Sequence, residues 1–215
     1  MTDAREEILG RIRAGLADLP RHGSDDAPAW TYGRATPMED VPSRFVTQCE
    51  DYHARVVRVP DAEVAGAVAR LLTEAGVASV AWPSGLAATW RAAVEAAGVD
   101  VVGDEPPLSN AQLDAIGGVV TAARVAIAET GTIVLDHDAD QGRRALTLLP
   151  DVHLCVVRAD QIVSDVPEAV ARLRASIDAG RPLTWISGGS ATSDIELQRV
   201  DGVHGPRTLL VVLVG

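Results

Sequence analysis

The sequence predicts an α/β protein whose open, mostly parallel sheet carries helices on both faces. Two observations support this prediction. Short apolar runs rich in valine alternate with helical segments from residue 54 onward, and glycines follow several of the helical segments. With 215 residues, of which 47% are hydrophobic, the chain is also long enough to bury a sizeable core in one main domain.

The expected elements follow from this alternation. From about residue 119 three apolar runs are separated by so few residues that helices cannot connect them all, which predicts a mixed sheet with at least one antiparallel pair. The expected strands cover 55–59, 79–82, 99–102, 119–121, 125–129, 132–136, 152–158, 183–186 and 208–214, and the expected helices cover 61–74, 86–97, 109–115 and 167–179.

The N-terminal part has a different character. Apolar residues at helical spacing predict an amphipathic helix over residues 3–19, which ends at Pro20. The stretch that follows, up to Pro42, contains several prolines and glycines and reads as an irregular arm. We therefore expect an N-terminal helix and arm over 1–43 and an α/β domain over 44–215.

Charge and composition exclude several function classes. The formal net charge of −11 argues against nucleic-acid binding, which needs a concentrated cationic face. All 19 basic residues are arginine, so mechanisms that need a lysine, such as Schiff-base, pyridoxal-phosphate and P-loop chemistry, are excluded.

The cysteines and the histidines give no sign of a metal centre. Cys49 and Cys155 are too few to hold a four-cysteine iron–sulfur cluster. The run 136–138, Asp-His-Asp, is interpreted as a solvated turn rather than a metal site. Free thiols, no signal peptide and no apolar run long enough to cross a bilayer lead us to expect a cytoplasmic protein without a membrane span.

The segment after the expected strand 183–186 is the first candidate site. It reads Ser187-Gly188-Gly189-Ser190, and Ser193 with Glu196 fits a capping box that predicts a helix starting near Ser193. Backbone amides next to glycine, together with a helix N-terminus, suit an anion. The expected ligand-binding loop runs from Ser187 to Asp194. An ordinary loop of Ser and Gly is the alternative reading.

Three other positions complete the candidates. His204, followed by Gly205, lies in a loop and is the best acid/base candidate because imidazole exchanges a proton near neutral pH. Arg143 is the expected anion clamp, since guanidinium forms forked contacts with carboxylate or phosphate. The turn Glu129-Thr130-Gly131-Thr132 joins two strands and is either a plain hairpin or part of a binding site.

These motifs together resemble the LUD-domain family, in particular its lactate-utilisation branch. The resemblance rests on residues 126–135, on Leu148-Leu149-Pro150 and on the tail from 187 to 206, and it covers roughly residue 50 to the C-terminus. The family usually has Pro at the position of Gly189 and Ala at that of Ser193. The resemblance implies a NagB/RpiA/CoA-transferase-like fold, in which Glu129 would face the ligand crevice where related CoA transferases carry a nucleophilic carboxylate.

The resemblance also implies a function. It suggests a non-redox component of a complex that oxidises lactate to pyruvate, with the iron–sulfur clusters on two partner proteins and no cofactor on this chain. The component would bind a small carboxylate or phosphate-containing ligand or act as a scaffold. Two alternatives remain: a stand-alone enzyme acting on a CoA-, phosphate- or folate-type substrate through Glu129, and an interaction module that uses the N-terminal helix.

Overall fold

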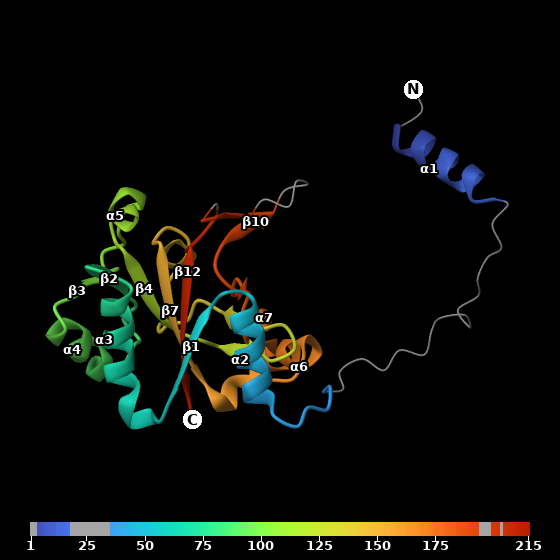
Figure 1. The fold of residues 1–215 in the computed structure, drawn as a ribbon. Coiled ribbons are helices and arrows are strands. Elements are labelled where there is room, and N and C mark those ends of the chain that lie inside the picture. The colour runs from blue at the N-terminus through green and yellow to red at the C-terminus, as the bar shows by residue number, and fades with distance from the viewer. Residues whose placement is uncertain (1–3, 18–34, 194–198, 203) are drawn as a thin grey trace. The chain divides into compact units, whose positions relative to one another are not determined.

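The computed structural model describes residues 4–17, 35–193, 199–202 and 204–215 (Figure 1). The chain divides into two units, 1–32 and 33–215. The first contains the helix α1 (Ala4–Gly15), which confirms the expected N-terminal helix. None of its described residues is buried, and Ile8, Ile12 and Leu16 are each more than half exposed.

The second unit is built on an open six-stranded sheet with the order β1-β12-β7-β4-β2-β3. All neighbouring strands in it are parallel, which confirms the predicted open α/β class. The strands are β1 (Arg55–Val59), β2 (Ser79–Trp82), β3 (Asp100–Gly103), β4 (Gly118–Ala122), β7 (Val152–Arg158) and β12 (Thr208–Val214).

Antiparallel pairs lie outside this sheet, and two of them belong to a second sheet of four strands with the order β8-β5-β6-β9. It consists of β5 (Val125–Ile127), β6 (Thr132–Leu135), β8 (Ile162–Val163) and β9 (Thr184–Ile186). The prediction of a mixed sheet with at least one antiparallel pair is therefore confirmed, because β5 pairs antiparallel with β6 and parallel with β8. These strands form a sheet separate from the large parallel one.

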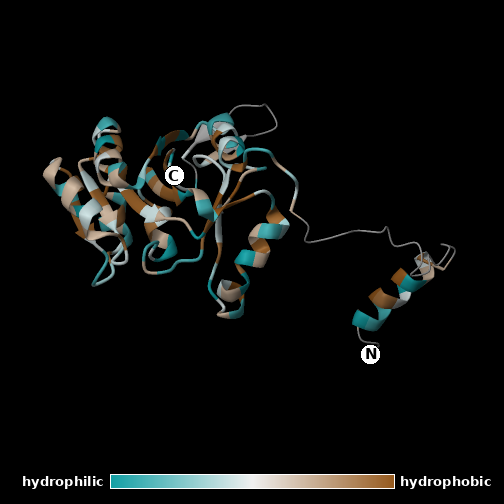
Figure 2. Cartoon of the chain, turned by 90° about the horizontal axis from the view of Figure 1, so that it is seen from below, coloured by the Kyte–Doolittle hydropathy of each residue, from teal (hydrophilic) through white to brown (hydrophobic). Residues whose placement is uncertain are grey.

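Helices and the small sheet cover the two faces of the large sheet (Figures 1 and 2). On one face, α3 (Val64–Glu74) and α4 (Ala88–Ala96) pack on the valines and leucines of the strands. On the other face, the four-stranded sheet and α2 (Val41–Asp51) bury Cys155, Val211 and Leu213. The far side of the small sheet packs against α6 (Val166–Arg172), which is followed by α7 (Arg174–Asp178).

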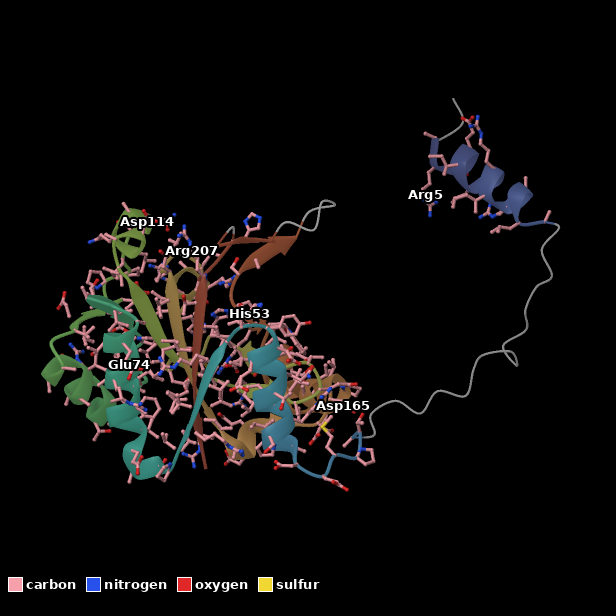
Figure 3. The ribbon with its side chains drawn as sticks, viewed as in Figure 1. Arg5, His53, Glu74, Asp114, Asp165 and Arg207 are labelled. Atoms are coloured by element: carbon pink, nitrogen blue, oxygen red, sulfur yellow. The ribbon has the colours of Figure 1, made fainter. Side chains whose placement is uncertain are left out.

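The helix α2 departs from the prediction, which places Pro42 in an irregular arm. In the structure Pro42 lies in the first turn, where its missing N–H costs nothing, and Asp40 caps the helix by accepting from the Ser43 amide. The preceding segment is also held in place, since the amide and hydroxyl of Thr36 both donate to Asp165 at the start of α6 (Figure 3).

The remaining elements are short. They comprise α5 (Asn110–Asp114), the 3-10 turns η2 (Asp61–Glu63), η3 (Arg144–Thr147) and η4 (Ala159–Gln161), and a hairpin of β10 (Ala191–Ser193) with β11 (Arg199–Asp201). Ser193 is the last residue of β10, and residues 194–198, where the helix expected near Ser193 would begin, lie outside the described residues. No helix in the described ranges combines the length and apolar character that a membrane span requires.

Candidate functional site

Residues of the turn η3 line two cavities, and Arg144 lines both. The smaller has a volume of about 260 Å³ and lies at the amino ends of β7 and β12, where His153 and Leu209 line it. Figure 3 marks this end of the sheet with His53, just before β1, and Arg207, just before β12. Its other described lining residues are Arg144, Thr147, 184–191 and 204–206.

The predicted loop Ser187–Ser190 forms one wall of this smaller cavity. Its glycines allow close packing: Gly188 has a φ of +80° and leaves no room for a Cβ beside Tyr52, and a Cβ on Gly189 would meet the carbonyl of Arg207. The Ser190 amide donates to the Pro206 carbonyl at 2.7 Å. The structure thus brings this loop together with the 204–206 segment.

His204 and Gly205 line the same cavity from the opposite loop. The His204 side chain is exposed, and its amide donates to Ser190 Oγ at 3.1 Å. Asp194, which the sequence placed in the ligand-binding set, lies outside the described residues.

The Thr130–Thr132 turn does not line the cavity but contacts the loop that does. Thr130 and Thr132 hydroxyls are 2.7 Å apart, and Thr132 is 2.7 Å from the Ser187 hydroxyl, so a chain of hydroxyls connects the turn to the loop. Gly131 has a φ of +60°, and its backbone lies against Gln48 and Cys49 of α2. Glu129 is exposed and lines neither described cavity.

Arg143, the predicted anion clamp, is already paired. Its Nε and one terminal nitrogen donate to the two carboxylate oxygens of Asp104 at 2.7 and 2.9 Å, and it also donates to the Leu108 carbonyl. Burial alone would raise the pKa of Asp104, but the hydrogen bonds from Arg143 and the Leu108 amide lower it. Arg143 lines only the larger cavity, apart from the Ser187–Ser190 loop.

Arg144, unlike Arg143, is not paired with a carboxylate in the described part of the chain. One terminal nitrogen donates to the carbonyl and hydroxyl of Thr147 at 2.9 and 3.1 Å. Partial burial of the guanidinium lowers the pKa of Arg144, although the residue as a whole is exposed. Sequence reasoning missed this residue, because nothing in the run Gly142-Arg143-Arg144 distinguishes its two arginines.

His153 is the second residue that sequence reasoning missed. It is fully buried on β7, and its Nε2 is 2.8 Å from the hydroxyl of Thr121 on β4. Burial, and next the positive charge of Arg144, lower the pKa of His153 to about 4, so the ring is neutral at physiological pH. The Thr121 and Cys155 side chains share its face of the sheet.

The larger cavity, of about 880 Å³, lies at the carboxyl ends of β2 and β3. Its described lining contains the carboxylates Asp104, Glu105 and Asp138 as well as arginines. Its cations other than Arg144 are engaged, since Arg143 binds Asp104 and Arg91 binds Glu95 at 2.8 Å.

The run 136–138 is not a solvated turn. Asp136 is fully buried, accepts from Ser176 at 2.6 Å and pairs with Arg124 and Arg181. His137 has a φ of +58°, and its ring bridges the Gly142 carbonyl and the Thr184 hydroxyl. Within the described ranges no group of His, Cys, Asp and Glu is arranged to hold a metal ion.

Fold and site together define an open α/β protein with a small polar pocket built from strand-end loops. The LUD domain family matches residues 43–214, and the chain belongs to this family.

Relatives agree with this assignment. The chain is 49% identical to "Lactate utilization protein C" of Deinococcus radiodurans, over 99% of this chain and 96% of that protein. It is 24% identical to the protein of the same name in Bacillus subtilis, over 98% of this chain and 95% of that one. A crystal structure described as a DUF162 family protein from Deinococcus radiodurans superposes with a TM-score of 0.72 at 48% identity, covering 83% of this chain and all of that chain.

Proposed function

We propose that this protein is a non-redox component of a lactate-utilisation system and that it binds a small carboxylate in the smaller cavity. The role in lactate utilisation is supported by the names of relatives that match nearly the whole chain. The observation that carries the binding proposal is the charge of the lining. The chain has a net charge of −11, yet the described lining of this cavity contains Arg144 and no Asp or Glu.

The size of the cavity supports a small ligand. At about 260 Å³ it falls below the range of roughly 300–1,000 Å³ that holds drug-sized molecules. A carboxylate of three or four carbons fits this volume better than a nucleotide or an entire CoA molecule.

The partners of the proposed system supply the electron transfer. A four-cysteine cluster needs four thiolates, whereas this chain has Cys49 and Cys155, both fully buried. We therefore place the iron–sulfur clusters on two partner proteins, as the family resemblance suggests. The stand-alone enzyme acting through Glu129 gains no support, because that side chain lines neither described cavity.

Gene deletion tests the proposed role. Removing the gene from its host should abolish growth on lactate as the sole carbon source and leave growth on pyruvate unchanged, and the wild-type gene should restore growth. Growth on lactate that does not depend on the gene would overturn the proposal. A Glu129→Gln gene that restores growth as fully as the wild type would argue further against the stand-alone enzyme.

A further inference from the structure

Arg144 has hydrogen-bonding capacity that the protein does not use. Only one of its terminal nitrogens has a partner in the described part of the chain, namely Thr147. Guanidinium carries five N–H donors in a planar fork, and carboxylates match that fork. Because Thr147 is buried and holds the side chain at the cavity, the remaining donors of Arg144 are available to an anion.

Backbone donors lie on the same cavity. Gly188 and Gly189 line it, and their N–H groups donate to no acceptor among the described residues. Free amides beside a guanidinium favour a negatively charged ligand. No described side chain on the wall supplies a competing negative charge.

His153 gives the cavity a neutral polar group. Its Nε2 is engaged with Thr121, and its Nδ1 has no hydrogen-bond partner within the described ranges. A neutral imidazole accepts a hydrogen bond at one ring nitrogen and donates at the other, according to its tautomer. With the Thr121 hydroxyl free to rotate, Nδ1 can accept from an alcohol or donate to a ketone.

From these three features we infer that Arg144 and His153 form a subsite for 2-oxygenated carboxylates. Arg144, with the amides of Gly188 and Gly189, binds the carboxylate, and His153 Nδ1 binds the oxygen at carbon 2, whether hydroxyl or keto. Both residues are binding residues, and no proton or electron transfer is assigned to them. The inference rests on the proposed function and specifies the substrate class and the residues that select it.

Ligand-observed NMR on the purified full-length protein tests the subsite, with L-lactate, pyruvate, propionate and inorganic phosphate as probes. Lactate and pyruvate should bind more tightly than propionate, which lacks the 2-oxygen. Arg144→Gln should weaken all three carboxylates by about 10- to 100-fold, the range expected for charge-assisted hydrogen bonds.

Two substitutions of His153 distinguish recognition of the oxygen at carbon 2 from a general effect on the packing of this side chain. Gln places its amide near the Nε2 position and so keeps the bond to Thr121, whereas Asn places its amide near Nδ1. His153→Gln should weaken lactate by about 3- to 10-fold and leave propionate unchanged. His153→Asn should retain more of the preference for lactate over propionate than His153→Gln does.

A matched control locates the binding. Arg91→Gln also removes an arginine, but this residue lines only the larger cavity, so the variant should bind every probe as the wild type does. Ligand affinity that responds to Arg91→Gln but not to Ser190→Ala would move the site to the larger cavity and overturn the inference.

The outcomes distinguish this inference from the function on which it rests. Equal weakening of lactate and propionate in His153→Gln, or wild-type affinity in Arg144→Gln, would overturn the subsite. If no probe binds although lactate growth depends on the gene, the role in lactate utilisation stands and the subsite falls. Preferential binding of phosphate would also overturn the 2-oxygenated class.

Discussion

The two cavities share Arg144 but differ in their balance of charge. The larger, of about 880 Å³, has three carboxylates in its described lining, and its arginines Arg91 and Arg143 are paired with Glu95 and Asp104. The smaller, of about 260 Å³, has no described carboxylate and contains the neutral His153. Volume alone would favour the larger cavity, whereas the uncompensated charge is the reason that we propose the smaller one as the anion site.

The largest effect that we expect is acid destabilisation through His153. Its pKa is about 4 in the folded protein and 6.5 as the ordinary value, so the unfolded chain binds the proton more readily between these values. Its contribution to stability is therefore complete above pH 6.5 and is lost as the pH falls to 4, by up to about 3 kcal/mol.

Urea unfolding between pH 7 and 4 measures this effect. His153→Gln should flatten the dependence of the unfolding free energy on pH in this window. His137→Gln, which changes a histidine on the larger cavity, should preserve the contribution of His153. If the unfolding free energy of His153→Gln depends on pH as steeply as that of the wild type, the wild-type ring is not held neutral by burial.

The second effect concerns the sign of charge in each cavity. Ser190→Asp introduces a carboxylate into the smaller cavity, where it would pair with Arg144 and repel the ligand, so lactate affinity should fall by about tenfold or more. Ser84→Asp makes the same change in the larger cavity and should leave lactate affinity unchanged. Similar losses in both variants, measured by NMR titration, would indicate a long-range effect of net charge rather than a site.

A third variant makes the two cavities more alike. Asp104→Asn removes the forked partner of Arg143 and should cost about 1–2 kcal/mol of stability in chemical denaturation. It should also give the larger cavity a new affinity for phosphate, because Arg143 loses its compensating charge. If phosphate shifts the melting temperature of wild type and variant equally, the ion pair does not control anion binding there.

The smallest effect is expected at the thiols, which line neither described cavity. Burial raises the pKa of both Cys49 and Cys155 to about 12, so neither thiol forms a thiolate at pH 8. A disulfide reagent should therefore modify no cysteine in the folded protein and two in denaturant. Rapid modification of the folded protein would contradict the burial of these side chains.

Much of the fold could be predicted from local patterns. The strands expected over 152–158 and 208–214 have the bounds of β7 and β12, because each is a continuous apolar run flanked by loop residues. The helix α2 was missed because a proline such as Pro42 indicates a break, although it is equally compatible with a first helical turn. The helix expected over 167–179 is divided into α6 and α7 on either side of Leu173.

The site was predicted less completely. The Ser187–Ser190 loop and the 204–205 pair do line one cavity, but Arg143 and Glu129 do not line it. Arg144 could be chosen over Arg143 as the anion-binding candidate only once Arg143 was seen to pair with Asp104. Asp104 lies 39 residues earlier in the chain. His153 was overlooked because a histidine inside an apolar strand has no local signal of function.

The sequence by itself determined the open α/β class, the strands of the large parallel sheet, the resemblance to the LUD domain and the absence of lysine chemistry. These properties depend on composition and on neighbours within a few residues. Only the tertiary structure decided which arginine is paired, which histidine is buried and neutral, and which cavity has no carboxylate in its described lining. Charge compensation and burial arise between residues that are distant in the chain, so a local pattern does not contain them.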